Sequence, residues 1–214
     1  FPYIHGVSPG DGKLFIVGIG PLGGGWGAKS NEDGVSATVC INDGDTHNSP
    51  TEQLESKYPV LVEKYQLRSD SGGAGRQRGG LGAEMVVQAL SPFTLTTRID
   101  RMHCKPWGLD GGHDALGNSI GVRTNGVWSE ELPNAKIFGV RIRKGDAYVM
   151  RSGGGGGFGS PLEREADLVL ADVQQGYVTA EAARSSYGVV IAQEGSLDAS
   201  ATRDLRQDML RAVE

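Results

Sequence analysis

Short apolar runs, separated by polar and glycine-rich stretches, dominate the first two thirds of the chain. Runs of this length that are rich in β-branched and aromatic residues are typical of strands. The pattern predicts strands at residues 13–19, 36–41, 60–69, 136–142 and 147–151. A short helix is expected after Ser49-Pro50, because proline is tolerated at the first helical position, and Tyr58-Pro59 should end it.

Residues 60–69 alternate between apolar and polar side chains, which indicates a half-buried strand. The alternation places Leu61, Tyr65 and Leu67 on one face, with Lys64 and Gln66 on the other.

Two turn signals predict hairpins. Ser91-Pro92 separates the apolar runs AEMVVQAL and FTLTTRI, and we expect these runs to pair with each other. Asn125-Gly126, within GVRTNGVW, is the strongest short hairpin signal in the chain. A long irregular loop is expected at residues 103–119.

A helical period replaces the strand pattern after the glycine run. Ser160-Pro161-Leu162-Glu163 has the residues of a capping box with proline at the first helical position. The apolar stripe of the predicted helix, which Gly176 should end, consists of Leu162, Ala166, Val169, Leu170 and Val173.

Two more helices are expected near the end of the chain. Thr179 should cap the first, and Asp198 should open the second, with a short strand at residues 188–192 between them. In the last helix, the residues predicted to face inward are Leu205, Met209 and Val213.

These elements indicate an α+β fold. We expect a β-rich body of antiparallel hairpins with glycine-rich loops, followed by a short helical C-terminal region. The corresponding division is residues 1–151 for the β-rich domain and residues 152–214 for the glycine loop and helices, which should pack on the same domain.

Composition narrows the function classes. Glycine accounts for 34 of 214 residues without a Gly-X-Y period, so collagen is excluded and tight loops in a folded protein are indicated. The net charge of −5 argues against a nucleic-acid partner, despite GRQRGG at residues 75–80. No apolar run is long enough for a membrane span, and two cysteines suit a reducing cytoplasm, so we expect a soluble cytoplasmic protein. Because the first residue is Phe1 and not Met, we expect either that an N-terminal part was removed or that the chain is a piece of something longer.

The glycine run is the most conspicuous candidate site. It comprises Gly153, Gly154, Gly155, Gly156, Gly157 and Gly159. A P-loop needs Lys and Ser or Thr after its last glycine, and Phe158-Gly159-Ser160 stands there instead. Two interpretations remain: an anion cradle before a helix, and a backbone-only turn that permits positive φ or close approach of another segment, which the sequence favours.

Arg76 and Arg78 are a second candidate, because two guanidinium groups on a glycine-rich loop can clamp a carboxylate or a phosphate. The alternative, which the sequence favours, is a charged turn that pairs with the many acidic residues. The histidines and cysteines lack the spacing of a closed zinc site, so no metal site is expected within this chain.

Several long strings resemble one family. GGGWGAKSNEDG, HNSPTEQLESKYP, YQLRSDSGGAGRQRGGLG, PWGLDGGHDALGN and KGDAYVMRSGGGGGFGSPLERE are similar to the C-terminal part of the B-type subunit of ATP-dependent hydantoinases and 5-oxoprolinases. The large subunits of acetone- and acetophenone-type carboxylases are related to that subunit. One departure from the family pattern is Asp43-Gly44-Asp45-Thr46-His47.

The resemblance implies that the chain is the C-terminal part of a B-type subunit, or a separately encoded piece of it, in a hetero-oligomeric complex. This ATP-dependent complex would hydrolyse a cyclic amide through a phosphorylated intermediate. ATP and Mg are expected on the A-type partner subunit, and a divalent metal in the N-terminal part of the B-type subunit, with neither held by this chain alone. Substrate- or phosphate-contacting candidates are Asn48, Glu52, Arg76 and Arg78. Two alternatives stay open: a subunit of a ketone carboxylase, and an assembly module without substrate contacts.

Overall fold

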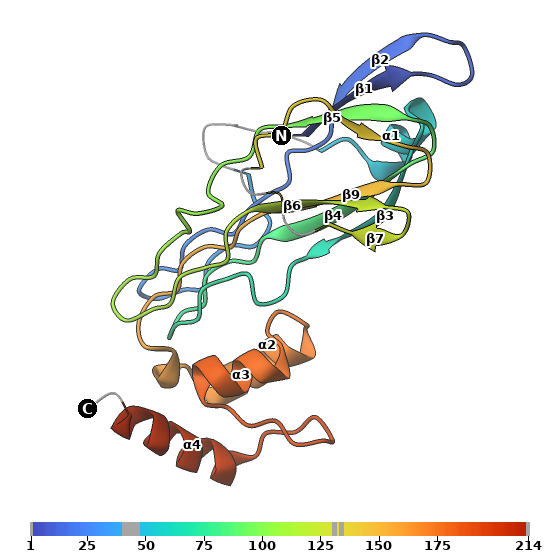
Figure 1. Ribbon diagram of the computed structural model, residues 1–214. Helices are drawn as coiled ribbons and strands as arrows, with labels where there is room; N and C mark the ends of the chain where they lie inside the picture. The colour runs from blue at the N-terminus through green and yellow to red at the C-terminus, as the bar shows by residue number, and fades with distance from the viewer. Residues whose placement is uncertain (1, 40–47, 130–131, 133–134, 213–214) are drawn as a thin grey trace.

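The computed structural model of the chain describes residues 2–39, 48–129, 132 and 135–212, and it shows the expected α+β fold (Figure 1). Two antiparallel sheets form one end, three helices form the other, and glycine-rich segments run between them. Among the described residues, none of the helices has the length and apolar character needed to cross a bilayer.

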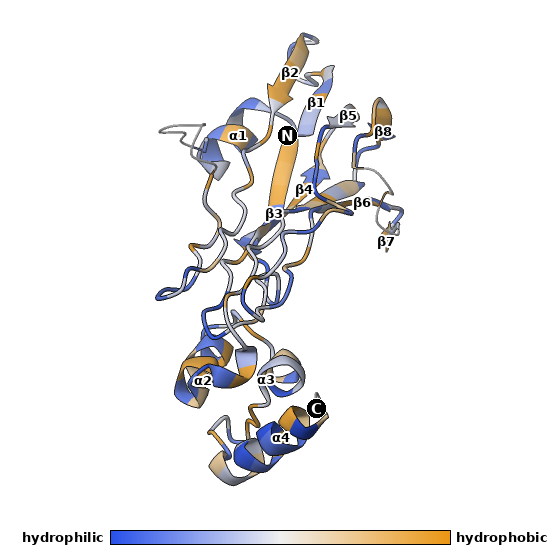
Figure 2. Ribbon diagram, turned by 90° about the vertical axis from the view of Figure 1, so that its left-hand side faces the viewer, coloured by the Kyte–Doolittle hydropathy of each residue, from blue (hydrophilic) through white to orange (hydrophobic). Residues whose placement is uncertain are grey.

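The first sheet has the strand order β2-β1-β5-β8. Its strands are β1 (Pro2–Val7), β2 (Leu14–Gly18), β5 (Phe93–Thr97) and β8 (Val140–Ile142), and all pair in antiparallel fashion. The hairpin of β1 and β2 extends away from the rest of the fold (Figure 1). Figure 2 shows the hydrophobic colour of β2, where Leu14 and Ile16 are 69% and 68% exposed.

The second sheet has the strand order β3-β4-β9-β6-β7. Its antiparallel strands are β3 (Val60–Leu67), β4 (Ala83–Ala89), β9 (Ala147–Arg151), β6 (Ser119–Thr124) and β7 (Val127–Trp128). The expected short helix, α1 (Thr51–Lys57), precedes β3. The Glu55 carboxylate fixes it there by accepting a 2.7 Å hydrogen bond from the backbone N–H of Val62.

Apolar side chains of both sheets form one core. Ile4 and Leu95 from the first sheet and Val87, Ile120 and Tyr148 from the second are all buried in it. Removing this apolar area from water is the main favourable contribution to folding of the β-rich part.

The predicted hairpin at Ser91-Pro92 is wrong. β4 and β5 belong to different sheets, and the chain crosses from one sheet to the other at this dipeptide. β4 is already paired with β3 on one edge and with β9 on the other, so it has no free edge for β5. The hairpin at Asn125-Gly126 is confirmed, with φ of 52° and 81° at the two turn residues, as a type I′ turn requires.

The predicted face of residues 60–69 is wrong at Leu61. A bulge between Val62 and Lys64 reverses the alternation, since an extra residue moves every later side chain to the other face. Tyr65 and Leu67 therefore share the face of Val62, whereas Leu61 lies on the opposite face and is 41% exposed.

Two other predicted strands are shorter than expected or missing. Of residues 36–41, the described part forms one isolated bridge at Thr38, because Ala37 has φ of 48° and its N–H donates to the carbonyl of Leu81. Residues 136–142 contribute only β8.

Glycine-rich segments pack backbone against backbone between the sheets and the helices. We call this region the glycine bundle; its segments are 23–27, 71–75, 78–82, 107–113 and 153–159. A Cβ built on Gly155 would lie 1.8 Å from the carbonyl oxygen of Trp26, and one on Gly79 would lie 1.8 Å from that of Gly155. Only glycine fits at these positions, because any side chain would overlap the neighbouring backbone, as it would at the axis of the collagen triple helix.

The helical region begins later than the capping box predicts. Pro161–Glu163 form a single 3-10 turn (η2) with no side-chain cap, Arg164 is extended, and α2 runs over Ala166–Gln174. The predicted single helix with Leu162 in its stripe is therefore wrong, because Arg164 leaves the helical conformation to bind acidic residues described below. Gly176, with φ of 74°, follows α2 as expected.

The last two helices have the predicted starts. Thr179 and Asp198 accept hydrogen bonds from Ala182 and Ala201, and α3 (Ala180–Tyr187) and α4 (Ala199–Arg211) follow them. The predicted strand at 188–192 is reduced to one bridge at Ile191. Figure 2 shows α4 as largely hydrophilic. Val213 lies outside the described residues, and the division at residue 151 stays a prediction.

Candidate functional site

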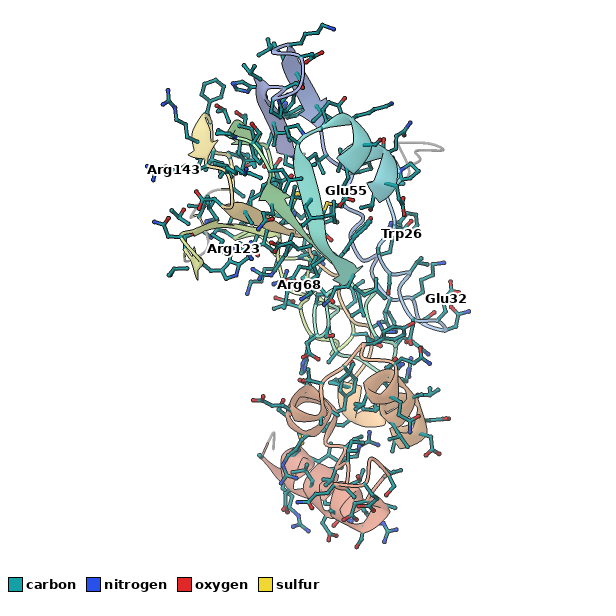
Figure 3. The ribbon with its side chains drawn as sticks, turned by 90° about the vertical axis from the view of Figure 1, so that its right-hand side faces the viewer. Trp26, Glu32, Glu55, Arg68, Arg123 and Arg143 are labelled. Atoms are coloured by element: carbon teal, nitrogen blue, oxygen red, sulfur yellow. The ribbon has the colours of Figure 1, made fainter. Side chains whose placement is uncertain are left out.

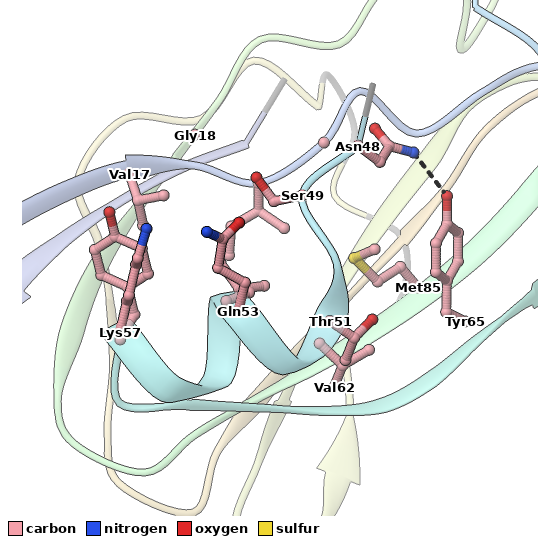
Figure 4. Close-up of a pocket in the computed structure, with 14 residues that line it drawn as sticks. Val17, Gly18, Asn48, Ser49, Thr51, Gln53, Lys57, Val62, Tyr65 and Met85 are labelled. Atoms are coloured by element: carbon pink, nitrogen blue, oxygen red, sulfur yellow. Dashed lines mark hydrogen bonds between the residues drawn. The ribbon is translucent and has the colours of Figure 1, made fainter. Parts of the chain in front are cut away.

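A small pocket lies between α1, β2 and β3 (Figure 4). Its volume is about 120 Å³, and its polar lining includes Asn48, Gln53, Lys57 and Tyr65. The side-chain amide of Asn48 donates a 3.1 Å hydrogen bond to the Tyr65 hydroxyl, so the loop before α1 is tied to β3. The pocket presents a carboxamide, a phenol and an ammonium group, which can orient a small polar molecule by hydrogen bonding.

Glu52, the other candidate residue near α1, lies away from the pocket. Glu52 lies on the exposed side of α1 and does not line the pocket. Residues 43–47, where the sequence departs from the family pattern, lie outside the described residues. Substrate contacts by Asn48 and Glu52 therefore stay predictions.

The glycine run lies inside the glycine bundle. The amides of Gly153 and Gly154 donate to the Asn118 side chain and the Leu116 carbonyl, and those of Gly155, Gly157 and Gly159 donate to Gly80, His113 and Leu109. Of the run, only Gly159 has a positive φ, of 73°. Because these amides are used within the fold, the geometry supports close backbone approach over an anion cradle.

Arg78 enters a buried network of ion pairs. Its guanidinium is 6% exposed, donates to the Asp172 carboxylate at 3.2 Å and to the carbonyl of Gly79 at 2.9 Å, and lies over the Tyr177 ring at 5.3 Å. These partners occupy the hydrogen-bonding positions that a ligand would need. The geometry therefore favours a structural role for Arg78 over ligand binding.

Arg164 is the second cation of this network. It is 2% exposed and binds both carboxylate oxygens of Asp33, at 2.8 Å and 2.6 Å, as well as Asp172 at 2.9 Å. Paired donors of a guanidinium match the two oxygens of a carboxylate, which makes this contact both strong and directional. The network joins segment 33–34, the glycine bundle and the helical region.

Arg76 lies outside the network. Its guanidinium is 42% exposed and only 3.5 Å from the Glu163 carboxylate, which is 59% exposed. Such an exposed pair contributes little to stability. Arg76 and Arg78 therefore do not form a matched pair of ligand donors, and contact of Arg76 with substrate stays a prediction.

Asp33 has a pKa below its ordinary value. Partial burial raises the pKa, but the hydrogen bonds and charge of Arg164, together with the N–H and charge of Arg78, lower it by more. A carboxyl whose pKa is lower in the folded state stabilises the fold above its unfolded pKa, and this stabilisation is lost as the pH falls through the folded value.

We therefore expect the stability advantage of the natural chain over an Asp33→Asn variant to shrink as the pH falls below about 4. The difference in free energy of unfolding between the two chains should fall by an amount on the order of 1 kcal/mol, because protonation of Asp33 removes the charge that Arg164 binds. Urea unfolding of both chains at several pH values from about 7 down to about 3 measures the difference in their stability. A gap that stays constant over this range contradicts the assignment.

The sequence did not identify three residues that organise these sites. Asp33 and Asp172 are the acids that Arg78 binds, but nothing in their sequence separation of more than a hundred residues marks them as neighbours. The third residue, Tyr65, is 45% exposed beside the pocket, and nothing in the alternation of residues 60–69 indicates a pocket there. Within the part of the chain that the structure describes, no group of three or more His, Cys, Asp or Glu side chains could hold a metal ion.

Comparison with known proteins gives consistent matches. The family model described as hydantoinase B/oxoprolinase matches residues 3–161. The B-type subunit of a putative D-/L-hydantoinase from Pseudomonas sp. (strain NS671) is 31% identical over 215 residues, which cover 95% of this chain and 36% of that protein.

Two solved structures share the fold. The nucleotide-free structure of acetone carboxylase has a TM-score of 0.83 at 24% identity, over 99% of this chain and 32% of that one. The ATP-dependent caprolactamase from Pseudomonas jessenii has a TM-score of 0.80 at 30% identity, over 96% of this chain and 37% of that one. The chain thus spans about a third of the length of these relatives.

Proposed function

Because this chain belongs to the hydantoinase B/oxoprolinase family, we propose that it forms part of the B-type subunit of an ATP-dependent complex that hydrolyses a cyclic amide. The observation that carries the proposal is the caprolactamase match, which combines a TM-score of 0.80 with 30% identity over 96% of the chain. Its partners in this proposal are an A-type ATP-binding subunit and the remaining part of the B-type subunit, in the cytoplasm.

The chemistry explains why such a complex needs ATP. An amide carbonyl is a poor electrophile, and phosphorylation of its oxygen makes the carbon reactive enough for water to add to it. The C–N bond of the adduct then breaks to give a free amine and an acyl phosphate, and a second water hydrolyses the acyl phosphate to a carboxylate and phosphate. In the proposed complex, ATP and Mg are bound by the A-type subunit, and a divalent metal by the remaining part of the B-type subunit. This chain supplies the pocket between α1, β2 and β3, where the carboxamide of Asn48 can orient a ring amide.

The exposed apolar side chains of the β1–β2 hairpin support the proposal that this chain binds a partner polypeptide. Leu14, Ile16 and Val7 are 69%, 68% and 54% exposed, and they lie on one face of the β1–β2 hairpin. A cluster of exposed apolar side chains is a common mark of an interaction surface. The hairpin is therefore where we place the contact with the rest of the complex.

Co-purification of the chain with an A-type subunit and the remaining B-type part tests the proposal. ADP release should require all three polypeptides and a cyclic amide, with caprolactam, 5-oxoproline and hydantoin as the substrates to try. ADP release that requires a ketone and bicarbonate would instead assign the chain to a carboxylase, an activity that the related fold of acetone carboxylase makes worth testing.

In the assembled complex, we expect Asn48→Ala to lower kcat/KM about threefold to tenfold, the effect of losing one hydrogen bond to the substrate. Ser56→Ala is the matched control, because Ser56 lies on α1, the helix that follows Asn48, and its hydroxyl donates to the carbonyl of Gln53. Steady-state kinetics of ring opening measures both. Equal kcat/KM for the natural complex and the Asn48 variant would exclude Asn48 from the site and favour a pure assembly role for this chain.

A further inference from the structure

A larger cleft lies apart from the pocket at α1. It has a volume of about 780 Å³ and is bordered by the start of β1, the glycine bundle, residues 98–101 and the end of β9. Tyr3, Leu22, Trp26, Ile99 and Met150 provide apolar or aromatic walls, so the cleft has a surface suited to the apolar body of a small molecule.

The charged groups of the cleft are mainly cations. Arg98, Arg101 and Arg151 line it, and Asp100 is the only acidic side chain among its described lining residues. The Asp100 carboxylate is already paired with the Lys136 ammonium at 2.5 Å. On a chain with a net charge of −5, this concentration of positive charge favours an anionic ligand.

Arg101 is the cation best placed to bind that ligand. Its guanidinium lies 5.9 Å from the centre of the Trp107 ring, and among the described residues no carboxylate lies within 4.0 Å of it. By contrast, Arg151 is bound to the Glu84 carboxylate, which also pairs with Lys64. Arg101 therefore retains donors for a ligand, whereas Arg151 is held by its own fold.

The backbone of Arg101 is held in an unusual conformation. Its φ of 57° lies in the left-handed region, which residues other than glycine, asparagine and aspartate rarely adopt. Asn118 holds it there: its N–H donates to the carbonyl of Arg101 at 3.1 Å, its side-chain amide donates to the carbonyl of Asp100 at 2.6 Å, and its side-chain oxygen accepts from Gly153. Such imposed strain is typical of functional positions.

Arg101 also stands where two hollows meet. A second hollow of about 440 Å³ is lined by Trp107 and by Gly153, Gly154, Gly155 and Gly156, and it shares Arg101 and Asn118 with the larger cleft. The turn held by Asn118 thus places Arg101 in the lining of both hollows, of which the larger contains Trp26 and the smaller contains Trp107. Figure 3 shows Trp26 on the segment that leads from the sheets towards the helices.

We propose that this cleft binds a small organic anion, with a carboxylate or phosphate head group on Arg101 and an apolar body against Trp26. A guanidinium can give two parallel hydrogen bonds to either head group, and the aromatic walls select a ligand with an apolar part. The inference goes beyond the proposed function, because it assigns a ligand to the isolated chain at a place separate from the pocket at α1.

Tryptophan fluorescence of the full 214-residue chain, titrated with hexanoate, hexyl phosphate and the neutral hexanamide, tests the inference. Hexanoate or hexyl phosphate should change the emission in a saturable manner, and whichever binds more tightly identifies the head group. Hexanamide should bind at least about tenfold more weakly, since it lacks the charge that Arg101 recognises.

Arg101→Gln should weaken anion binding at least about tenfold, because a charge-assisted pair is replaced by a neutral contact. Arg143→Gln is the matched control: Arg143 is an exposed arginine in the turn after β8, and Figure 3 places it on the opposite side of the view from Trp26. Three outcomes would each overturn the inference: no saturable change with either anion, equal binding of hexanamide, or equal weakening by both variants.

Discussion

Replacing Gly155 with alanine is expected to destabilise the chain by more than about 4 kcal/mol, a loss sufficient to unfold a domain of ordinary stability. The added Cβ would lie 1.8 Å from the carbonyl oxygen of Trp26 and 2.4 Å from the backbone nitrogen of Gly27. Both are backbone atoms, so no side chain can rotate away, and the segments of the glycine bundle must separate. Soluble yield and thermal unfolding followed by circular dichroism measure the effect.

Gly27→Ala is the matched control from the same bundle. Its nearest atom would be the carbonyl oxygen of Gly156 at 3.9 Å, an ordinary contact distance, so we expect a change within about 0.5 kcal/mol. If both variants unfold at the temperature of the natural chain, the bundle is not packed as tightly as described. If both are equally unstable, the loss does not come from the contact of Gly155 with Trp26.

Arg164→Ala is expected to reduce the free energy of unfolding by about 3–5 kcal/mol, the cost of breaking a buried ion pair by removing one partner. The substitution leaves Asp33 without its paired hydrogen bonds and Asp172 with Arg78 as its remaining cation. Because Arg164 lies between the glycine bundle and α2, the helical region should loosen first. Urea unfolding measures the free energy, and limited proteolysis locates the opened segment.

Arg76→Ala serves as the comparison, since Arg76 pairs only with an exposed glutamate at 3.5 Å. A change of about 0–1 kcal/mol is expected for it. Equal effects of the two substitutions would show that burial of Arg164 does not determine its contribution. Cleavage of the β-rich part before the helices would contradict the assignment of the network to the joint between them.

The sequence predicted those features that depend on neighbouring residues. Asn125-Gly126 specifies its own turn, and Thr179 and Asp198 cap their helices through contacts three residues away. The fold class followed as well, since the change from strand to helix pattern after the glycine run is a property of the sequence itself.

The sequence could not predict features that depend on distant segments. β4 and β5 are separated by three residues, but their pairing partners are set by the edges that β3, β9, β1 and β8 occupy. The capping box predicted at Ser160 depends on neighbouring residues alone, but its side-chain hydrogen bond is not formed, and Arg164 is instead held in an extended conformation by Asp33 and Asp172. Likewise, nothing within residues 76–78 distinguishes the buried Arg78 from the exposed Arg76.

The glycine bundle also bears on how the chain is made. Its segments are residues 23–27, 71–75, 78–82, 107–113 and 153–159, so the first segment contacts residues that are synthesised much later. Contacts between such distant segments slow folding, and glycine loses more backbone entropy on ordering than other residues. The contact of Gly25 with Gly153 can therefore form only after Gly153 has left the ribosome, and we expect chaperone protection of the first segment to be most valuable before then.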